Sequence, residues 1–382
     1  EDPSPGLTQP IQVGPEQLNL NGTGVFDPMG YEYELGALRS IRGDNSIVGT
    51  IRQGQIHGNY WFDGWRLFGT TSNAMMPATF YGVDTDSRLT LTGVLSDGWE
   101  MVKVGGGTLE LGGPYGTNTG QAIRVKAGTL AFNKPAGVYG INGGWLQVGD
   151  DDPAGPDATL LMLSDDQVND DAWWVVGSNG TVDFNGHREI LEGLALTMGP
   201  AGGATLNLGA GGQIYIERGG NADFILLQTI GTGNATGARV LDGTLNLTVP
   251  SYGALGGTRN ITVGRGLSRE NTAGSDLRIT SAMTDGSGLT SIAVSKYGFG
   301  TLELAGTAPN TFTGQYYNVQ GTTLLNKGAG TGGVNAVGGS LRTGDANWGE
   351  GIFNSDVVRW LQPNQLPTTM PSRMWMSPVG SI

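Results

Sequence analysis

The sequence Val104-Gly-Gly-Gly-Thr-Leu-Glu-Leu111 returns almost unchanged as Tyr297-Gly-Phe-Gly-Thr-Leu-Glu-Leu304. Each copy is followed by a Gly-rich turn, a Thr-Gly pair, a short strand and a second Thr-Leu strand. A unit that recurs within one chain usually stacks on its neighbours, because it cannot bury its apolar face alone. The repeat therefore predicts stacked coils, and a surface or a rod is the first functional expectation.

The composition is that of a turn-rich β chain. Glycine contributes 68 of the 382 residues, well above the usual share of about 7%. The glycines follow no Gly-X-Y period, which excludes collagen, and charged residues make up only 14%. Because a solenoid grows by adding coils, this length does not imply several globular domains.

Short segments in which every second residue is apolar dominate the chain. Examples are Arg88-Leu-Thr-Leu-Thr92, Ala204-Thr-Leu-Asn-Leu208 and Gly243-Thr-Leu-Asn-Leu247. This alternation predicts half-buried strands with one face inward and one outward. Gly, Asn or Asp bounds nearly all of them, as expected where the backbone turns with a positive φ. Only residues 168–174 and 357–361 suggest a turn or two of helix.

The internal alignment pairs residues 86–133 with residues 276–327. These residues resemble the passenger-associated strand repeats of bacterial autotransporters and related secreted proteins. That pattern runs from a strand and a Lys through Gly-Thr-Leu-x-Leu-x-Gly to an Asn, a Thr-Gly pair and a second Gly-Thr-Leu strand. Residues 296–325 fit it closely, and residues 103–132 fit it with a shorter turn.

A second phrase, from Gly180 to Thr197, is similar to the strand, Asn-Gly turn and strand unit that accompanies those repeats. Together the matches imply an all-β fold, a right-handed parallel β-helix (β-solenoid). Short strands, polar turns and an interior of Leu, Val, Ile and Phe fit that fold independently of the resemblance.

Atypical segments flank the expected β-helix. Residues 1–30, interrupted by prolines, predict an extended N-terminal arm, residues 31–342 the β-helix, and residues 343–382 a C-terminal cap or docking tail. Whether residues 31–85 are first coils or a separate cap stays open. The tail is too apolar for a disordered linker. Four of its aromatic residues are candidates for self-association: Trp348, Phe353, Trp360 and Trp375.

Solenoid ends expose unpaired backbone groups and apolar side chains. The two atypical segments therefore either cap their own helix or dock onto the next copy, which would build a polymer head to tail. The sequence leaves both readings open.

Charge and cysteine content narrow the partners and the compartment. The net charge of −13 and the lack of a basic patch argue against nucleic acid as a partner. No cysteine is present, which removes disulfides and thiolate chemistry and suits a bacterial surface protein. Residue 1 is Glu without a preceding apolar stretch, as expected of a mature secreted product or of a chain that never had a signal. The sequence contains no run of 18 apolar residues and therefore predicts no transmembrane helix.

No catalytic set is evident, so we expect a protein that is not an enzyme. His57 and His187 lie outside any Gly-x-Ser-x-Gly elbow, and a polar strand or turn position is the stronger interpretation of both. The one dense acidic stretch includes Asp150, Asp151, Asp152 and Asp157. These oxygens are a weak candidate for Ca²⁺, although a solvated loop is the favoured interpretation and no cofactor is required.

Aromatic clusters provide the remaining candidate binding site. Residues 60–68, Trp173-Trp174 and Tyr316-Tyr317 could stack on sugar rings, but structural packing is the preferred interpretation. The leading hypothesis is thus a secreted structural β-solenoid of the cell surface or extracellular matrix, which self-associates into fibres through its termini. The alternatives are a β-helix protein that binds or degrades polysaccharide, and an adhesin passenger.

Overall fold

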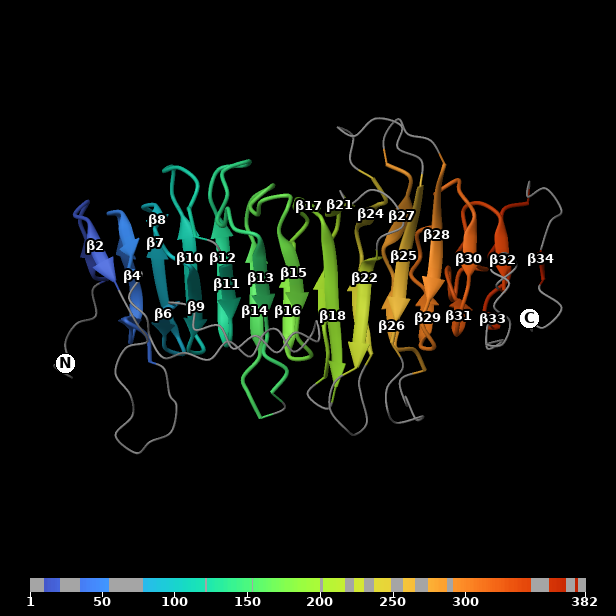
Figure 1. The fold of residues 1–382 in the computed structure, drawn as a ribbon, viewed down its shortest axis with the longest axis horizontal. Helices are drawn as coiled ribbons and strands as arrows, with labels where there is room; N and C mark the ends of the chain where they lie inside the picture. Colours follow the sequence, from blue (N-terminus) through green and yellow to red (C-terminus); the bar gives the residue numbers. More distant parts are fainter. Residues whose placement is uncertain are drawn as a thin grey trace. The chain divides into compact units, whose positions relative to one another are not determined.

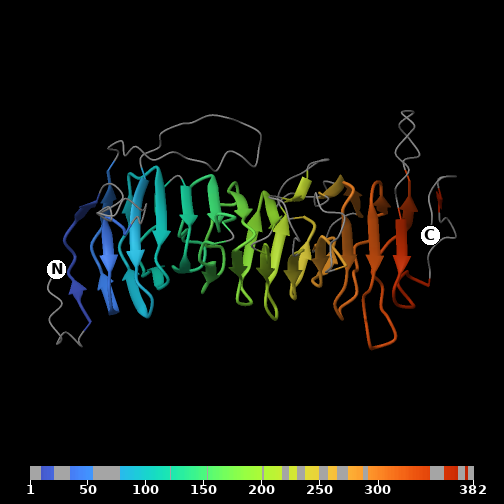
Figure 2. The same cartoon turned by 90° about the horizontal axis from the view of Figure 1, so that it is seen from below.

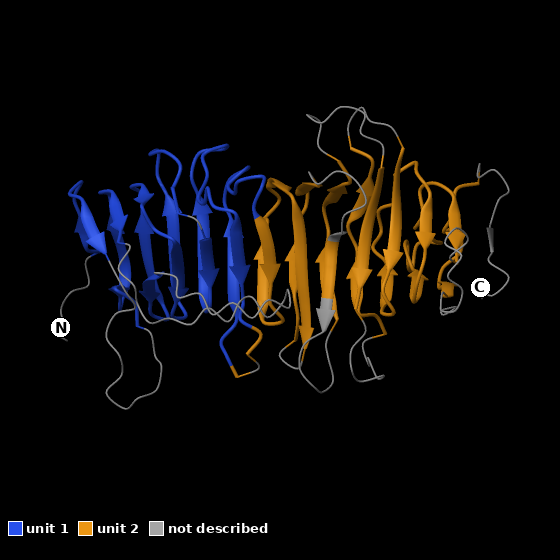
Figure 3. Ribbon diagram, viewed as in Figure 1, with its two compact units in different colours: residues 1–150, 155–172 blue, residues 151–154, 173–382 orange. Residues whose placement is uncertain are grey.

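The computed structural model divides the chain into two compact units, coloured separately in Figure 3. Unit 1 comprises residues 1–150 and 155–172, and unit 2 comprises residues 151–154 and 173–382. The structure describes residues 10–20, 35–54, 78–120, 122–152, 154–199, 202–216, 223–229, 237–248, 257–264, 274–286, 291–344, 357–368 and 375–376. All regular elements in these ranges are strands.

Unit 1 contains three parallel sheets whose strands follow one another in chain order, from blue to green in Figure 1. Sheet 1 has the order β1 (Gln12–Val13), β4 (Gly43–Ile47), β7 (Ser87–Leu91), β10 (Thr108–Gly112), β12 (Gly128–Asn133) and β14 (Ala158–Met162). Sheet 2 has the order β3 (Leu38–Ser40), β6 (Ala78–Val83), β9 (Glu100–Val104), β11 (Ala122–Val125) and β13 (Trp145–Val148). Sheet 3 has the order β2 (Leu18–Leu20), β5 (Ile51–Gln53) and β8 (Leu95–Ser96).

Unit 2 repeats this three-sheet arrangement, which Figure 2 shows from below. Its sheet 1 has the order β16 (Gly180–Asp183), β20 (Thr205–Asn207), β23 (Ala238–Leu241), β26 (Leu277–Ile279), β29 (Thr301–Leu304), β31 (Thr322–Leu325) and β33 (Val357–Trp360). Sheet 2 has the order β15 (Trp173–Val176), β18 (Gly193–Gly199), β22 (Asp223–Thr229), β25 (Gly257–Val263), β28 (Ile292–Tyr297), β30 (Tyr316–Asn318), β32 (Leu341–Thr343) and β34 (Trp375–Met376). Sheet 3 has the order β17 (Arg188–Leu191), β21 (Gln213–Ile216), β24 (Thr244–Asn246) and β27 (Ala282–Thr284), and the short β19 (Gly202–Gly203) pairs antiparallel to β18.

Inward-facing apolar side chains, many of them leucines, stack from coil to coil and form the core. Leu109 of β10 lies in register with Leu89 on one side and Leu130 on the other, and all three are buried. In unit 2, Leu302 of β29 lies beside Leu277 and is also fully buried. Because alternate side chains of a strand point to opposite faces, this register puts Leu89, Leu109 and Leu130 of unit 1 and Leu277 and Leu302 of unit 2 inside. The prediction of an all-β parallel β-helix is confirmed.

The two copies of the repeated sequence occupy equivalent strands, β10 and β29, and their glutamates face outward. Glu110 accepts hydrogen bonds from Arg88 in the preceding coil and from Asn133 in the following coil. Glu303 forms an ion pair with Arg278 of the preceding coil and accepts a hydrogen bond from Asn326 of the following coil. The repeated phrase thus carries both an inward leucine stack and an outward polar link across three coils.

The structural repeat extends beyond the alignment found in the sequence. The Gln167 side chain accepts from the backbone N–H of Lys134 at 2.9 Å, and Gln365 accepts from that of Lys327 at the same distance. Both glutamines follow a residue with positive φ, and both are fully buried. The alignment missed this equivalence because the residues around the two glutamines differ.

The expectation of short helices was wrong. Residues 173–176 form β15 and residues 357–360 form β33. Trp-Trp-Val-Val and Val-Val-Arg-Trp consist largely of aromatic and β-branched residues, which favour strands once a neighbouring strand is available. Pairing to β18 and β31 provides that neighbour.

Candidate functional site

Two of the four acidic residues proposed for calcium, Asp151 and Asp152, accept hydrogen bonds from protein groups. The Asp151 carboxylate accepts from the Ser178 N–H and from the Thr197 hydroxyl, both at 2.5 Å, and Asp152 accepts from the Ala154 N–H at 2.9 Å. Within the described ranges, no three His, Cys, Asp or Glu side chains converge as metal ligands. Asp150 and Asp157 belong to unit 1. The calcium site stays a prediction.

His187 lies next to a turn, and one residue of each described aromatic pair is fully buried. His187 follows the Asn185-Gly186 turn between β16 and β17, as the sequence predicted. Trp174 is fully buried and stacks on Phe184 with a centroid distance of 5.8 Å. Tyr316 is likewise buried, and its hydroxyl lies 2.9 Å from that of Thr323. His57 and residues 60–68 lie outside the described residues.

Of the four aromatic residues proposed for self-association, Trp360 is the one whose side chain the structure describes. Trp348 and Phe353 lie outside the described residues, and Trp375 is placed in β34 by its backbone register beside Arg342. Trp360 pairs with Leu325, a fully buried residue, so Trp360 also faces the core side of its sheet. It is nevertheless only half-buried.

β33 is an edge strand of unit 2, since it pairs with β31 alone among the described strands. The N–H groups of Val357 and Leu361 donate to Gly321 and Leu325 at 2.8 and 2.9 Å, which fixes the strand against β31. Leu361 is 48% exposed. This edge therefore combines a half-buried tryptophan, an exposed leucine and one side of the backbone that pairs with no described strand.

Unit 1 has a comparable edge at β1, which pairs with β4 alone among the described strands. The N–H groups of Ser46 and Val48 donate to the carbonyls of Ile11 and Val13 at 2.9 and 3.1 Å. Val13 lies beside buried Ile47 and so faces the core, but it is only half-buried, and Ile11 is 54% exposed. In sheet 3, the core-facing leucines of edge strand β2 are also half-buried.

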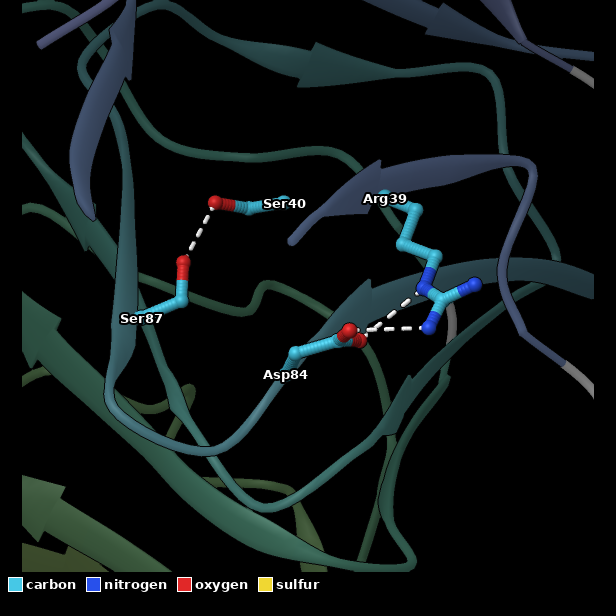
Figure 4. A network of polar contacts seen from close by, with 4 residues as sticks. All are labelled: Arg39, Ser40, Asp84 and Ser87. Atoms are coloured by element: carbon cyan, nitrogen blue, oxygen red, sulfur yellow. Dashed lines mark hydrogen bonds and ion pairs between the residues drawn. The ribbon is translucent and has the colours of Figure 1, made fainter. Parts of the chain in front are cut away.

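Polar contacts bind edge strand β3 of unit 1 to the next coil (Figure 4). The Arg39 guanidinium faces the Asp84 carboxylate and makes a double contact at 2.9 and 2.8 Å. Beside it, the Ser40 and Ser87 hydroxyls lie 2.7 Å apart. The double contact gives this terminal coil a defined orientation, although it is partly exposed to solvent.

The internal repeat contains a residue in unit 1, Met162, whose position is equivalent to that of Trp360. Met162 of β14 pairs with Phe132 as Trp360 pairs with Leu325, in matching Gly-Thr-x-x-x-Asn-Lys strands. Met162 is only 1% exposed. The β33 edge is therefore a coil surface of a kind that is buried elsewhere in the same chain.

Two lysines of the repeat have a structural role that the sequence did not reveal. The Lys103 ammonium donates to the carbonyls of Val104, Gly105 and Ala127 at 2.6–3.0 Å. The equivalent Lys296 donates to the carbonyls of Gly298, Gly300 and Gln320. Burial lowers the pKa of each lysine to about 7. The sequence shows that each lysine precedes a Gly-rich turn. It does not show that three backbone carbonyls surround each ammonium, because these carbonyls come together only when the coils stack.

Comparison with known protein families, curated proteins and solved structures yields no match to this chain. The described part of the chain contains no helix of the length and apolarity that crossing a membrane demands. The fold and the geometry of its edges are therefore the basis for a functional proposal.

Proposed function

We propose that this chain is a secreted structural β-solenoid that forms cell-surface or extracellular matrix material by associating end to end with further copies. The observation that supports this most directly is the pair of apolar edges. One consists of half-buried Val13 in β1 and the preceding Ile11, and the other of Trp360 in β33 and the following Leu361. Parallel strands with unpaired backbone groups are templates for a further strand. An end-to-end contact would bury both edges.

Three further observations fit this role. Stacked coils provide a stiff unit with extended surfaces. The resemblance of residues 296–325 to autotransporter passenger repeats favours secretion and a place at the cell surface. The conspicuous polar groups of the repeat, such as Glu110 and Glu303, are already bonded to neighbouring coils.

Polysaccharide binding is the second candidate function, and an outward aromatic residue favours it. Tyr317 and Arg342 lie in register on sheet 2 of unit 2, with the guanidinium 5.8 Å from the ring centre. A ring of this kind can stack on a sugar face. Retention of the protein on immobilised acidic and neutral polysaccharides, lost in Tyr317→Ala, would support this candidate.

Electron microscopy and sedimentation velocity of the purified protein over a range of concentrations test the leading proposal. We expect fibres or a mass that rises with concentration, and we expect Leu361→Lys to suppress both. Phe299→Lys is the matched control, because Phe299 is 49% exposed in the same unit but, unlike Leu361, is not adjacent to the edge strand β33. Particles that stay monomeric at high concentration would rule out self-association.

A further inference from the structure

The edge strands β1 and β33 each have backbone groups that point away from their sheet, where no described strand pairs with them. In a parallel strand, the N–H and C=O of one residue point to the same side, and successive residues alternate. Because Val357 and Leu361 donate to residues on the β31 side, the backbone groups of Val358 and Trp360 point away. At β1, the carbonyls of Ile11 and Val13 accept from Ser46 and Val48 on the β4 side, so the N–H and C=O of Gln12 point away from β4.

This alternation limits how β1 could add to β33. When two parallel strands pair, a residue whose N–H and C=O point toward the partner strand lies opposite a residue whose N–H and C=O point away from the first strand. Gln12 must therefore stand opposite Val357, Arg359 or Leu361. Arg359 agrees with the faces as well, since Arg359 and Gln12 are both exposed residues between core-facing neighbours.

The turns that follow β1 and β33 distinguish among these three registers. On β1, residues 14–17 separate Val13 from Leu18, the first residue of β2. After β33, residues 361–364 separate Trp360 from Gln365, whose carbonyl accepts from the Ala336 N–H at 2.9 Å. The two turns have equal length, so both corners coincide when Val13 stands opposite Trp360. That register puts Gln12 opposite Arg359.

We infer that β1 of one copy adds as a parallel strand to β33 of a second copy, with Gln12 opposite Arg359. In this contact the Gln12 N–H donates to the Val358 carbonyl, and the Trp360 N–H donates to the Gln12 carbonyl. On the core side, Ile11 covers Val358 and Val13 covers Trp360. The inference rests on the proposed end-to-end association and names the surface and the register that produce it.

The lack of cysteine in this chain allows a direct test. Gln12→Cys and Arg359→Cys are made as separate variants with different tags, mixed, allowed to assemble and oxidised. Neighbouring strands place opposite Cα atoms about 4.8 Å apart, within the range of about 4.4–6.8 Å that a disulfide spans. We expect a disulfide-linked species that carries both tags at the combined mass of two chains.

Two pairs serve as controls. Ser46→Cys mixed with Arg359→Cys tests the next strand inward, where the Cα atoms would be about 9.6 Å apart. Gln12→Cys mixed with Val357→Cys tests a register shifted by two residues, at about 8 Å. Both distances exceed the disulfide range, so we expect little mixed product.

The outcomes separate this inference from the proposed function. If fibres form but the disulfide-linked product appears in a control pair and not in the Gln12→Cys and Arg359→Cys pair, the register is wrong and end-to-end association still holds. Fibres without any mixed product would overturn β1 and β33 as the contact. Monomeric particles without mixed product would overturn both the contact and the proposed function, and would leave the chain's own segments as the cover of these edges.

Discussion

The buried lysine of the second repeat copy allows a test of the coil corner through pH. Lys296 is fully buried, and its ammonium lies among three backbone carbonyls. Lys296→Met keeps a side chain of similar length and removes the titrating group. The informative quantity is the difference in free energy of unfolding between the parent protein and this variant, followed as the pH rises.

The direction and size of the change follow from the two pKa values. Burial lowers the pKa of Lys296 from 10.5 to about 7, and the charge of Asp276 opposes this shift without cancelling it. Between these values the unfolded chain holds the proton and the folded chain has released it, so stability rises with pH. From pH 7 to pH 9 the parent should gain about 2 kcal/mol relative to Lys296→Met.

Urea unfolding followed by tryptophan fluorescence at intervals of half a pH unit measures this difference. Groups other than Lys296 titrate in both proteins and largely cancel. Below pH 6 both states of the parent hold the proton, so the difference should be flat there. A difference that stays flat to pH 9 would refute the reasoning, because it would mean that the three carbonyls keep the ammonium charged despite its burial. Lys103→Met repeats the experiment in unit 1.

Three further predictions concern packing, backbone and buried polar groups. Leu302→Ala should cost about 2–5 kcal/mol, because it removes a fully buried side chain from the leucine stack; chemical unfolding measures the loss, and a loss below 1 kcal/mol would count against a close-packed stack. Gly298→Ala should lower Tm more than Gly330→Ala: both have positive φ, but only the Gly298 Cβ would meet a neighbour, 2.3 Å from the Val263 carbonyl oxygen. Equal shifts would leave backbone strain as the cause. Gln365→Ala should cost about 1–3 kcal/mol and speed hydrogen exchange at its partner amide, since buried groups lose their bonds; unchanged exchange would contradict the equivalence with Gln167.

Much of the fold could be predicted from the sequence because it depends on local alternation. The Thr-Leu-Glu-Leu strands fix which residues face inward, and a shift by one residue would place Leu109 and Leu111 in solvent. Both are buried in the structure. The Asn185-Gly186 turn could be predicted for a similar reason, since both residues adopt positive φ.

The rest depends on contacts between coils that no local pattern encodes. The Lys296 ammonium binds the carbonyl of Gln320, 24 residues away, which becomes a neighbour only when the next coil stacks. Structural packing was the preferred interpretation of Trp173-Trp174 and Tyr316-Tyr317, but which member of each pair faces inward, Trp174 and Tyr316, depends on how the strands stack. For the same reason, the apolar tail residues could be proposed for self-association, but the edge that carries Trp360 could not be located.

The edges matter because the two outward glutamates of the repeat, Glu110 and Glu303, already bind side chains of neighbouring coils. Glu303 accepts a hydrogen bond from Asn326 and forms an ion pair with Arg278, and Glu110 makes similar contacts to Asn133 and Arg88. A second copy that bound there would have to break these links between coils before it gained any of its own. At β33, by contrast, a new strand meets backbone groups that point away from the sheet and a tryptophan that is only half-buried. The same forces that stack one coil on the next within the chain therefore support the proposal that further copies add at the edge strands.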